Sequence, residues 1–162
     1  MGEGTSSVDA KTALRRDLRA VRRALPDRPE RSERIRQVLT TLESVVRARR
    51  VLVFSTIVGE PEMAGVVEDL QRGGAEVGRP EDEFPPTWPE VVIAPGLAFT
   101  PAGARLGQGG GWYDRFLADV SPGCTTIGVC FREQVLDDLP IEPHDIAVDI
   151  VVTDRGVVHS AG

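Results

Sequence analysis

Residues 91–94 read Val-Val-Ile-Ala, and residues 105–114 read Arg-Leu-Gly-Gln-Gly-Gly-Gly-Trp-Tyr-Asp. The first run is short and wholly apolar, which is typical of a strand buried in a parallel sheet. Phe116-Leu117, after the second run, lies within an expected helix. The glycines therefore belong to a loop between a strand and a helix, where backbone amides can bind an anion such as a phosphate. A glycine-rich surface turn is the alternative interpretation of the same residues.

Length and composition favour one globular domain. The chain has 162 residues, of which 41% are hydrophobic, enough for a core that needs neither disulfides nor a structural metal. Its first residues are polar and charged, and no apolar run is long enough to cross a bilayer. We therefore expect a cytoplasmic protein that does not associate with membranes. Cys124 and Cys130 are expected to be buried free thiols, since no histidine or further cysteine lies near them.

The charge is distributed unevenly along the chain. The net charge is −6, yet residues 1–50 contain 13 basic and only 7 acidic side chains. Such a segment would attract a polyanion, but it carries no interleaved aromatic residues and the whole chain is acidic. A solvated helix surface is the preferred interpretation, and we expect no nucleic-acid partner.

Hydrophobic periodicity predicts an alternation of helices and strands. The first helix has Leu14, Leu18, Val21 and Leu25 on one face and ends at Pro26. A second stripe on this helix is basic and consists of Lys11, Arg15, Arg19 and Arg22. Further helices are expected over residues 30–48 and 61–72, and strands over residues 51–55, 76–79, 91–94, 125–131 and 148–153. In the helix over 30–48 the inward residues are expected to be Ile35, Val38, Leu39, Leu42 and Val46.

This alternation predicts an α/β fold of three layers, a mostly parallel sheet with helices on both faces. Ligands of such folds bind at the carboxyl ends of the strands, and the glycine loop follows the strand over residues 91–94. Residues 1–10 are expected to be flexible. Residues 78–90, which contain four prolines, are expected to form an irregular loop.

Longer motifs carry a family resemblance. They are Pro95-Gly96-Leu97-Ala98-Phe99, the run from Gly103 to Asp114, Ile127-Gly128-Val129, Gln134, Leu139-Pro140, His144-Asp145, Val148-Asp149 through Val152-Thr153, and the spacing of Lys11 and Arg15. Together they resemble the 5-formyltetrahydrofolate cyclo-ligase family, also called methenyltetrahydrofolate synthetases. The resemblance implies a Rossmann-like cyclo-ligase fold in one domain over residues 1–162.

The resemblance also implies a reaction. Members of this family close a ring, converting 5-formyltetrahydrofolate to 5,10-methenyltetrahydrofolate with ATP and Mg²⁺ and releasing ADP and phosphate. The formamide oxygen is a poor leaving group, so the γ-phosphoryl group of ATP is transferred to it before N10 attacks the carbon. Phosphoryl transfer asks a protein for positioning and positive charge more than for bases or nucleophiles. The implied partners are thus ATP and a small folate, and the implied state is a monomer or weak homodimer.

Site residues follow from matching the family's motifs to this sequence. The residues implied to bind ATP are Lys11, Arg15, Arg105, Leu106, Gly107, Gln108, Gly109, Gly110, Gly111, Trp112 and Tyr113. Those implied to contact the substrate are Glu60, Gln108 and Trp112, and those implied to bind Mg²⁺ are Asp114 and Asp149.

The residues by themselves leave alternatives open. Lys11 is the only lysine beside 18 arginines, which suggests a site for a compact charge, although chance placement explains it too. Asp114 would otherwise complement a helix dipole. Trp112 would either stack on the pterin ring or pack under the loop. For His144 we favour a hydrogen-bonded structural role.

One segment departs from the family. Between the helix over 61–72 and the strand over 91–94, family members have an extra strand and loop that help to wall the folate pocket, and here residues 78–90 are short. This shortening leaves two alternative functions: a nucleotide-binding paralogue without cyclo-ligase activity, or an enzyme with another substrate, such as a thiamin-related one.

Overall fold

A computed structural model of the chain describes residues 7–158. Residues 1–10 are expected to be flexible, and residues 1–6 of this range lie outside the described residues. Residues 7–10 form the first turn of helix α1, Ser7–Ala24. No helix among residues 7–158 is long and apolar enough to cross a membrane.

A six-stranded sheet forms the centre of the molecule, with the strand order β2-β1-β3-β6-β7-β8. The first five strands in this order are parallel, and β8 pairs antiparallel with β7, so the predicted mostly parallel sheet is confirmed. The strands are β1 (Arg50–Val53), β2 (Glu76–Gly78), β3 (Val91–Pro95), β6 (Thr125–Val129), β7 (Ile150–Thr153) and β8 (Gly156–Val158).

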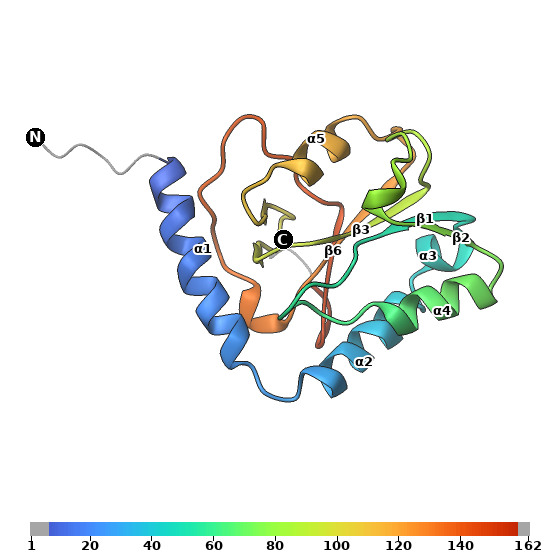
Figure 1. Ribbon diagram of the computed structural model, residues 1–162, viewed down its shortest axis with the longest axis horizontal. Coiled ribbons are helices and arrows are strands. Elements are labelled where there is room, and N and C mark those ends of the chain that lie inside the picture. The colour runs from blue at the N-terminus through green and yellow to red at the C-terminus, as the bar shows by residue number, and fades with distance from the viewer. Residues whose placement is uncertain (1–6, 159–162) are drawn as a thin grey trace, which may run out of the picture.

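Helices cover both faces of this sheet (Figure 1). Helices α2 (Arg28–Leu39), α3 (Glu43–Arg47) and α4 (Ala64–Arg72) pack on one face, and α5 (Trp112–Ala118) packs on the other. The packing of β3 explains why its sequence is continuously apolar. Its side chains alternate between the two clusters, so both faces are buried and none points to water.

Helix α1 packs away from the sheet, on a small hairpin. The hairpin consists of β4 (Ala98–Phe99) and β5 (Arg105–Leu106), which no hydrophobic pattern predicted. A separate apolar cluster joins the helix to the hairpin and contains Leu18, Leu97, Ala98, Leu106 and Leu139. The basic stripe of α1 consequently faces the glycine loop.

The structure corrects the expected helix over residues 30–48. It is two helices, α2 and α3, because the hydroxyls of Thr40 and Thr41 donate hydrogen bonds to the carbonyls of Arg36 and Val38 and end the first helix. Val46, expected inside, is exposed on α3, and Val21 is likewise exposed on α1.

Other boundaries also shift. Helix α4 begins at Ala64 rather than at residue 61, since the Glu62 carboxylate accepts hydrogen bonds from the N–H groups of Met63 and Ala64. Residues 78–90 are mostly irregular as expected, with a short 3₁₀ turn, η1 (Pro80–Asp82). Cys124 and Cys130 flank β6 as buried free thiols, and burial raises the pKa of the Cys124 thiol to about 11.

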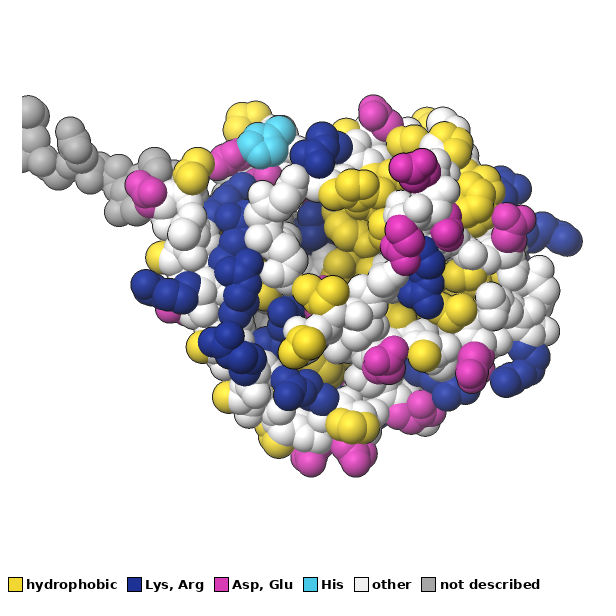
Figure 2. All heavy atoms as spheres, in the orientation of Figure 1, with side chains coloured by type: hydrophobic (Ala, Val, Ile, Leu, Met, Phe, Trp, Pro, Cys, Tyr) yellow, Lys and Arg dark blue, Asp and Glu magenta, His cyan; other side chains and the backbone are white. Residues whose placement is uncertain are grey.

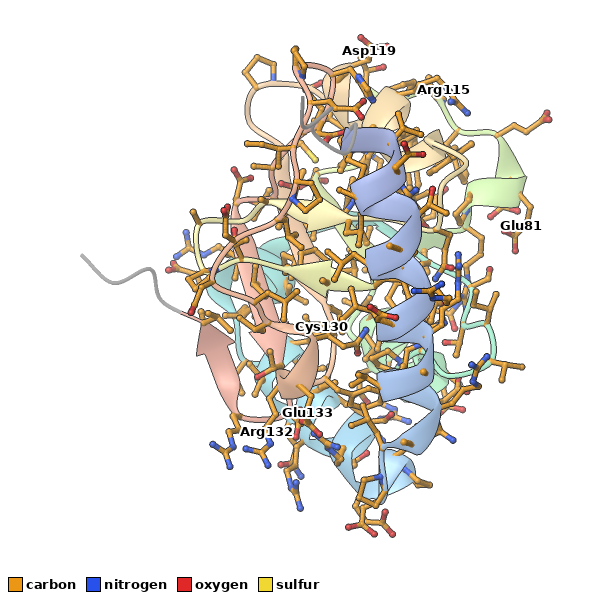
Figure 3. All side chains as sticks on the ribbon, turned by 90° about the vertical axis from the view of Figure 1, so that its left-hand side faces the viewer. Glu81, Arg115, Asp119, Cys130, Arg132 and Glu133 are labelled. Carbon is orange, nitrogen blue, oxygen red and sulfur yellow. The ribbon has the colours of Figure 1, made fainter. Side chains whose placement is uncertain are left out.

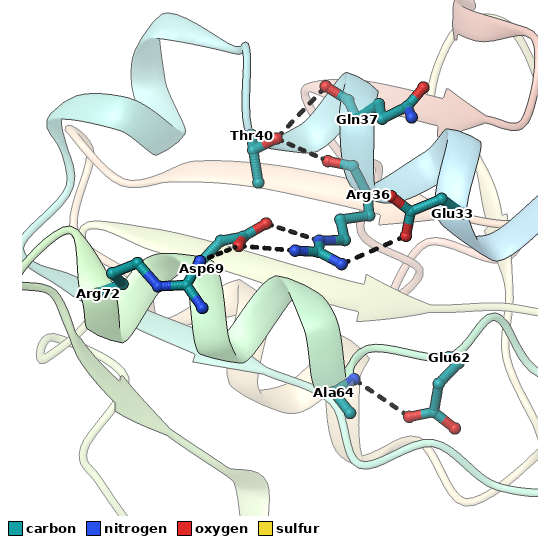
Figure 4. A network of polar contacts seen from close by, with 8 residues as sticks. All are labelled: Glu33, Arg36, Gln37, Thr40, Glu62, Ala64, Asp69 and Arg72. Atoms are coloured by element: carbon teal, nitrogen blue, oxygen red, sulfur yellow. Dashed lines mark hydrogen bonds and ion pairs between the residues drawn. The ribbon is translucent and has the colours of Figure 1, made fainter.

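A polar network links α2 to α4 (Figure 4). The Arg36 guanidinium donates two hydrogen bonds to the Asp69 carboxylate, at 2.7 and 2.9 Å, and these bonds lower the pKa of Asp69. Gly65 allows the close approach of the two helices, because a Cβ there would lie 2.9 Å from Cδ of Arg36.

A second network, which is more deeply buried, joins α2 to the end of the sheet. Arg31 on α2 donates from Nε to the Asp154 carboxylate at 3.0 Å, and it also pairs with Glu133. Asp154 also accepts a hydrogen bond from the N–H of Arg132 at 2.9 Å. Arg132 and Glu133 belong to the 3₁₀ turn η2 (Arg132–Gln134) and lie together at one end of the molecule (Figure 3).

Both carboxylates in this network titrate at lower pH when the protein is folded. Burial alone would raise the pKa of Asp154, but the hydrogen bonds from Arg132 and Arg31 hold it below its ordinary value. The hydrogen bond from Arg31 likewise lowers the pKa of Glu133. Such groups stabilise the fold above their unfolded pKa values, about 3.9 for Asp and 4.3 for Glu. The contribution is lost as the pH falls through the folded values.

We predict that Arg31→Met lowers the free energy of unfolding at pH 7 by about 3 kcal/mol, since it leaves the Asp154 carboxylate buried without its cation. The wild-type protein should lose stability steeply below about pH 5, and the variant should lose less over that range. Urea unfolding between pH 3 and 7 measures both effects. If the free energy of unfolding depended on pH equally in the two proteins, the stabilising role of the ion pairs of Arg31 would be contradicted.

Candidate functional site

A cavity of about 250 Å³ opens at the carboxyl end of β3, between α1 and the first turn of α5. Lys and Arg side chains form a column along α1 beside this hollow, which has hydrophobic atoms on its floor (Figure 2). Its lining residues are Lys11, Arg15, Pro95, Gly96, Arg105, Gly107, Gln108, Gly109, Gly110, Gly111, Trp112, Tyr113, Asp114, His144 and Asp145. The structure thus brings most of the residues expected to bind ATP to one cavity, where a parallel sheet places its ligands.

The glycine loop over residues 107–111 has a backbone that only glycine adopts readily. Gly109 has φ +114° and Gly111 has φ +74°, and Gly111 leads directly into α5. Within the described chain, the N–H groups of residues 107–111 donate no hydrogen bond to protein atoms. The loop therefore offers free backbone donors next to a helix N-terminus, as a phosphate requires.

The carbonyl groups of the same loop are bound by arginines. Nε of Arg15 donates to the carbonyl of Gly107 at 2.9 Å, and Arg19 donates to the carbonyl of Gln108 at 3.1 Å. Arg115, on α5, donates to the carbonyl of Gly110 at 3.0 Å. The arginines thus tie the loop to a helix on each side.

Arg105 is buried below the cavity. It donates a hydrogen bond to the carbonyl of Pro95 at 2.9 Å, and its guanidinium lies 5.3 Å from the centre of the Tyr113 ring. Nη2 of Arg105 lies 3.8 Å from the Asp114 carboxylate, while Nε has no hydrogen-bond partner among the described residues. Burial lowers the pKa of Arg105, and the negative charge of Asp114 opposes this effect.

Lys11 already has an acidic partner. Its Nζ lies 2.6 Å from the carboxylate of Asp145 and 3.8 Å from that of Glu142. Burial alone would raise the pKa of Asp145, but its hydrogen bonds with Lys11 and the N–H of Glu142 lower it. His144 is exposed and lies 3.2 Å from Glu142, so its placement agrees with a structural role. Sequence reasoning missed Asp145, which is 134 residues away from Lys11 and adjoins it only through the fold.

The two aspartates expected to bind Mg²⁺ lie apart. Asp114 is in the first turn of α5 and lines the cavity. Asp149 precedes β7 and accepts hydrogen bonds from the N–H and the hydroxyl of Thr126, at 2.9 and 3.1 Å. Thr126 is at the start of β6, about 10 Å of strand from the carboxyl edge. The structure therefore does not bring Asp149 to Asp114, and residues 7–158 contain no group of three metal-binding side chains.

The remaining expected residues have different surroundings. Trp112 is 37% exposed at the rim, with its ring stacked on Phe116 at 4.9 Å, so one face of the indole is packed and part remains open. Leu106 is buried in the cluster under α1 and does not line the cavity. Glu60 is buried in the loop after β1 and does not line the cavity; it lines a separate hollow beside α2.

Comparison with known proteins gives a consistent result. Residues 79–154 match the model of the 5-formyltetrahydrofolate cyclo-ligase family. The chain is 30% identical to a 5-formyltetrahydrofolate cyclo-ligase of Mycolicibacterium smegmatis, covering 94% of this chain and 98% of the relative. It is also 30% identical to the enzyme of that name from Escherichia coli, covering 86% and 98%.

The alignment with the M. smegmatis relative extends over 192 positions, more than the 162 residues of this chain. The relative thus has residues that this chain lacks.

Solved structures agree on the fold. The chain is similar to a 5,10-methenyltetrahydrofolate synthetase of Aquifex aeolicus, with a TM-score of 0.79, 24% identity and coverage of 94% of this chain and 93% of that one. A synthetase of the same name from Mycoplasma pneumoniae gives a TM-score of 0.78 at 23% identity, covering 89% of this chain and 98% of that one.

The positions of the two aspartates lead to a prediction. Asp114→Asn should reduce the rise in melting temperature that Mg-ATP produces, corresponding to at least about tenfold weaker binding, because a carboxylate at the cavity is lost. Asp149→Ala should lower the free energy of unfolding by about 1 kcal/mol, since Thr126 loses its acceptor, and leave the Mg-ATP effect intact. Thermal unfolding with and without Mg-ATP measures both. If the Asp149→Ala variant folded but its melting temperature no longer rose with Mg-ATP, the separation of a ligand-binding Asp114 from a structural Asp149 would be contradicted.

Proposed function

The chain belongs to the 5-formyltetrahydrofolate cyclo-ligase family, and we propose that it converts 5-formyltetrahydrofolate to 5,10-methenyltetrahydrofolate at the expense of ATP. The observation that carries this proposal is the cavity in which the free amides of residues 107–111 face Lys11 and Arg15 of α1. Amide donors opposite two cations make a binding site for a polyphosphate.

Lys11 and Arg15 have separate tasks in this proposal. Arg15 holds the loop through the carbonyl of Gly107 and still lines the cavity. Lys11 exchanges Asp145 for a phosphate oxygen when ATP arrives, because the ammonium group is a compact charge on a flexible stem. Both cations would oppose the negative charge that builds up on the transferring phosphoryl group.

The residues at the cavity also suit Mg²⁺. This ion binds through one or two carboxylates, substrate phosphates and several waters, so a single carboxylate at the phosphate cavity is a fitting donor. Asp114 meets this requirement, since it lines the cavity and part of its side chain is accessible. When bound, Mg²⁺ would neutralise negative charge on the phosphates and favour transfer of the γ-phosphoryl group.

The folate is assigned to the side of the cavity near Gln108, Trp112 and Glu60. The open part of the Trp112 ring is a surface on which a pterin can stack. The Gln108 side chain accepts a hydrogen bond from Arg19 at 3.2 Å, which orients its amide at the rim. Glu60 adds a carboxylate in the neighbouring hollow, suited to the N–H donors of a pterin.

The reaction needs no base or nucleophile from the chain. Transfer of the γ-phosphoryl group to the formyl oxygen makes that oxygen a leaving group. N10 then attacks the formyl carbon and loses its proton to the departing phosphate or to water, and departure of phosphate leaves the methenyl bridge. The protein's contribution is to hold the two substrates in line and to surround the phosphates with fixed donors. The cavity described contains such donors in Lys11, Arg15 and the amides of the glycine loop. We propose that the protein acts in the cytoplasm and that its oligomeric state is a monomer or a weak homodimer.

We predict that Lys11→Met lowers kcat/KM for methenyltetrahydrofolate formation about 100-fold, equivalent to about 2.7 kcal/mol of transition-state stabilisation. The measurement is the absorbance of the product with purified protein, Mg-ATP and 5-formyltetrahydrofolate. Arg16→Met is the matched control, because Arg16 is exposed on the same helix and, within residues 7–158, forms an ion pair only with its neighbour Asp17.

Wild-type activity in this assay is the primary test. Absence of product at high enzyme concentration would overturn the proposed reaction. In that case a melting temperature that rises with Mg-ATP alone would point to a nucleotide-binding paralogue. Full activity of Lys11→Met would overturn the role of Lys11.

A further inference from the structure

The basic stripe of α1 continues beyond the phosphate cavity to Arg22. This arginine is 5% exposed, so its charge is held almost out of water. Its Nη2 donates a long hydrogen bond of 3.4 Å to the carbonyl of Val58, in the loop after β1. Its Nη1 is fully buried and has no hydrogen-bond partner within the described part of the chain. A buried cationic donor without a partner is costly, so Arg22 requires an explanation beyond stability.

The loop after β1 is shaped to lie on this guanidinium. Gly59 has φ +91°, a conformation that other residues rarely adopt. A Cβ at Gly59 would lie only 2.8 Å from Nε of Arg22. The loop therefore needs glycine at this position both for its turn and for its contact with Arg22.

Glu60 follows directly and is buried as well. Its carboxylate accepts a hydrogen bond from the N–H of Ile57 at 3.0 Å, and its own N–H donates to the carbonyl of Ile57 at 3.0 Å. Among the described residues, no ion pair within 4.0 Å joins Glu60 to Arg22 or to another cation. One carboxylate oxygen thus remains open to a ligand.

Charged groups face Glu60 from α1 and α5, and Arg28, Glu33 and Arg36 of α2 line the same hollow. Burial raises the pKa of Glu60, while the N–H of Ile57 and the charge of Arg22 on α1 lower it. On α5, burial raises the pKa of Tyr113, and the negative charge of Glu60 raises it further. Tyr113 lines the phosphate cavity, so the charge of Glu60 acts on a wall of that cavity, while Glu60 itself lines a separate hollow beside α2.

We propose that Arg22 is a positioning residue for folate recognition: it supports the loop over residues 56–60 from below and places a cation behind the Glu60 carboxylate. Glu60 is then ionised and directed at the N–H donors of the pterin ring. This inference rests on the proposed function, and it assigns a role to Arg22 that involves no contact with the substrate.

The test compares Arg22→Gln and Arg22→Lys with Arg23→Gln, a matched control because Arg23 is exposed on the same helix. For Arg22→Gln we expect KM and Kd for 5-formyltetrahydrofolate to rise at least tenfold, with KM for ATP within twofold of wild type. Arg22→Lys should recover most of this loss, and Arg23→Gln should show none. Kd is measured by quenching of the tryptophan fluorescence, to which Trp88 and Trp112 both contribute, and folding by melting temperature.

A pH series separates positioning from a general loss of structure. Wild-type affinity for the folate should fall at acid pH as Glu60 is protonated, and in Arg22→Gln this fall should move to higher pH because the opposing cation is gone. The proposal would be overturned if Arg22→Gln raised KM equally for both substrates. It would also be overturned if the folded variant lost affinity for the folate at the same acid pH as the wild type. If Arg22→Gln does not fold, Gly59→Ala, which displaces the loop from the guanidinium, should show the same loss confined to the folate.

The inference and the proposed function fail in different ways. An active wild type with an unaffected, folded Arg22→Gln variant overturns only the role of Arg22. A wild type that binds 5-formyltetrahydrofolate without turnover overturns only the reaction, and the Kd comparison still tests Arg22. A wild type that neither binds nor converts the folate overturns both.

Discussion

The packing of α1 on the β4–β5 hairpin is the contact on which the site depends. A few apolar side chains make it, with Leu18 of the helix against Leu97 and Leu106 at the hairpin. Because the helix is held there and not on the sheet, its basic stripe faces the cavity at the carboxyl end of β3. The hydrophobic energy that anchors the helix therefore also keeps several cations close to one another.

The cations near the cavity are balanced to different degrees. Lys11 is neutralised by Asp145, whereas Arg105 and Arg22 each keep a buried nitrogen without a hydrogen bond among the described residues. Arg31, in the network with Asp154 away from the cavity, pairs through Nε and Nη2 with two carboxylates, and none of its nitrogens is buried without a partner. No buried nitrogen is thus left unpaired where this arginine supports the fold. Incomplete pairing occurs beside the space that we assign to ligands, as expected where polar groups await a partner.

Local patterns in the sequence predicted the sheet and the glycine loop but not the arrangement of the site. Strand β3 was predictable because a strand buried on both faces is apolar throughout. The break after α2 was not, since it depends on hydroxyl bonds of Thr40 and Thr41 that compete with the helix. The pairing of Lys11 with Asp145 and the distance of Asp149 from the cavity depend on which strand edge each residue reaches. Spacing along the chain contains no such information.

The arginines that bind the carbonyls of the glycine loop have a consequence for the kinetics of ligand capture. A free loop of this composition would visit many backbone conformations, and a ligand would have to select one of them. Here hydrogen bonds from Arg15 and Arg115 hold the loop from both sides. The conformational entropy of the glycine loop is thus lost when the protein folds and not when the ligand binds. Such preorganisation favours rapid entry and a small entropic penalty for an incoming polyphosphate.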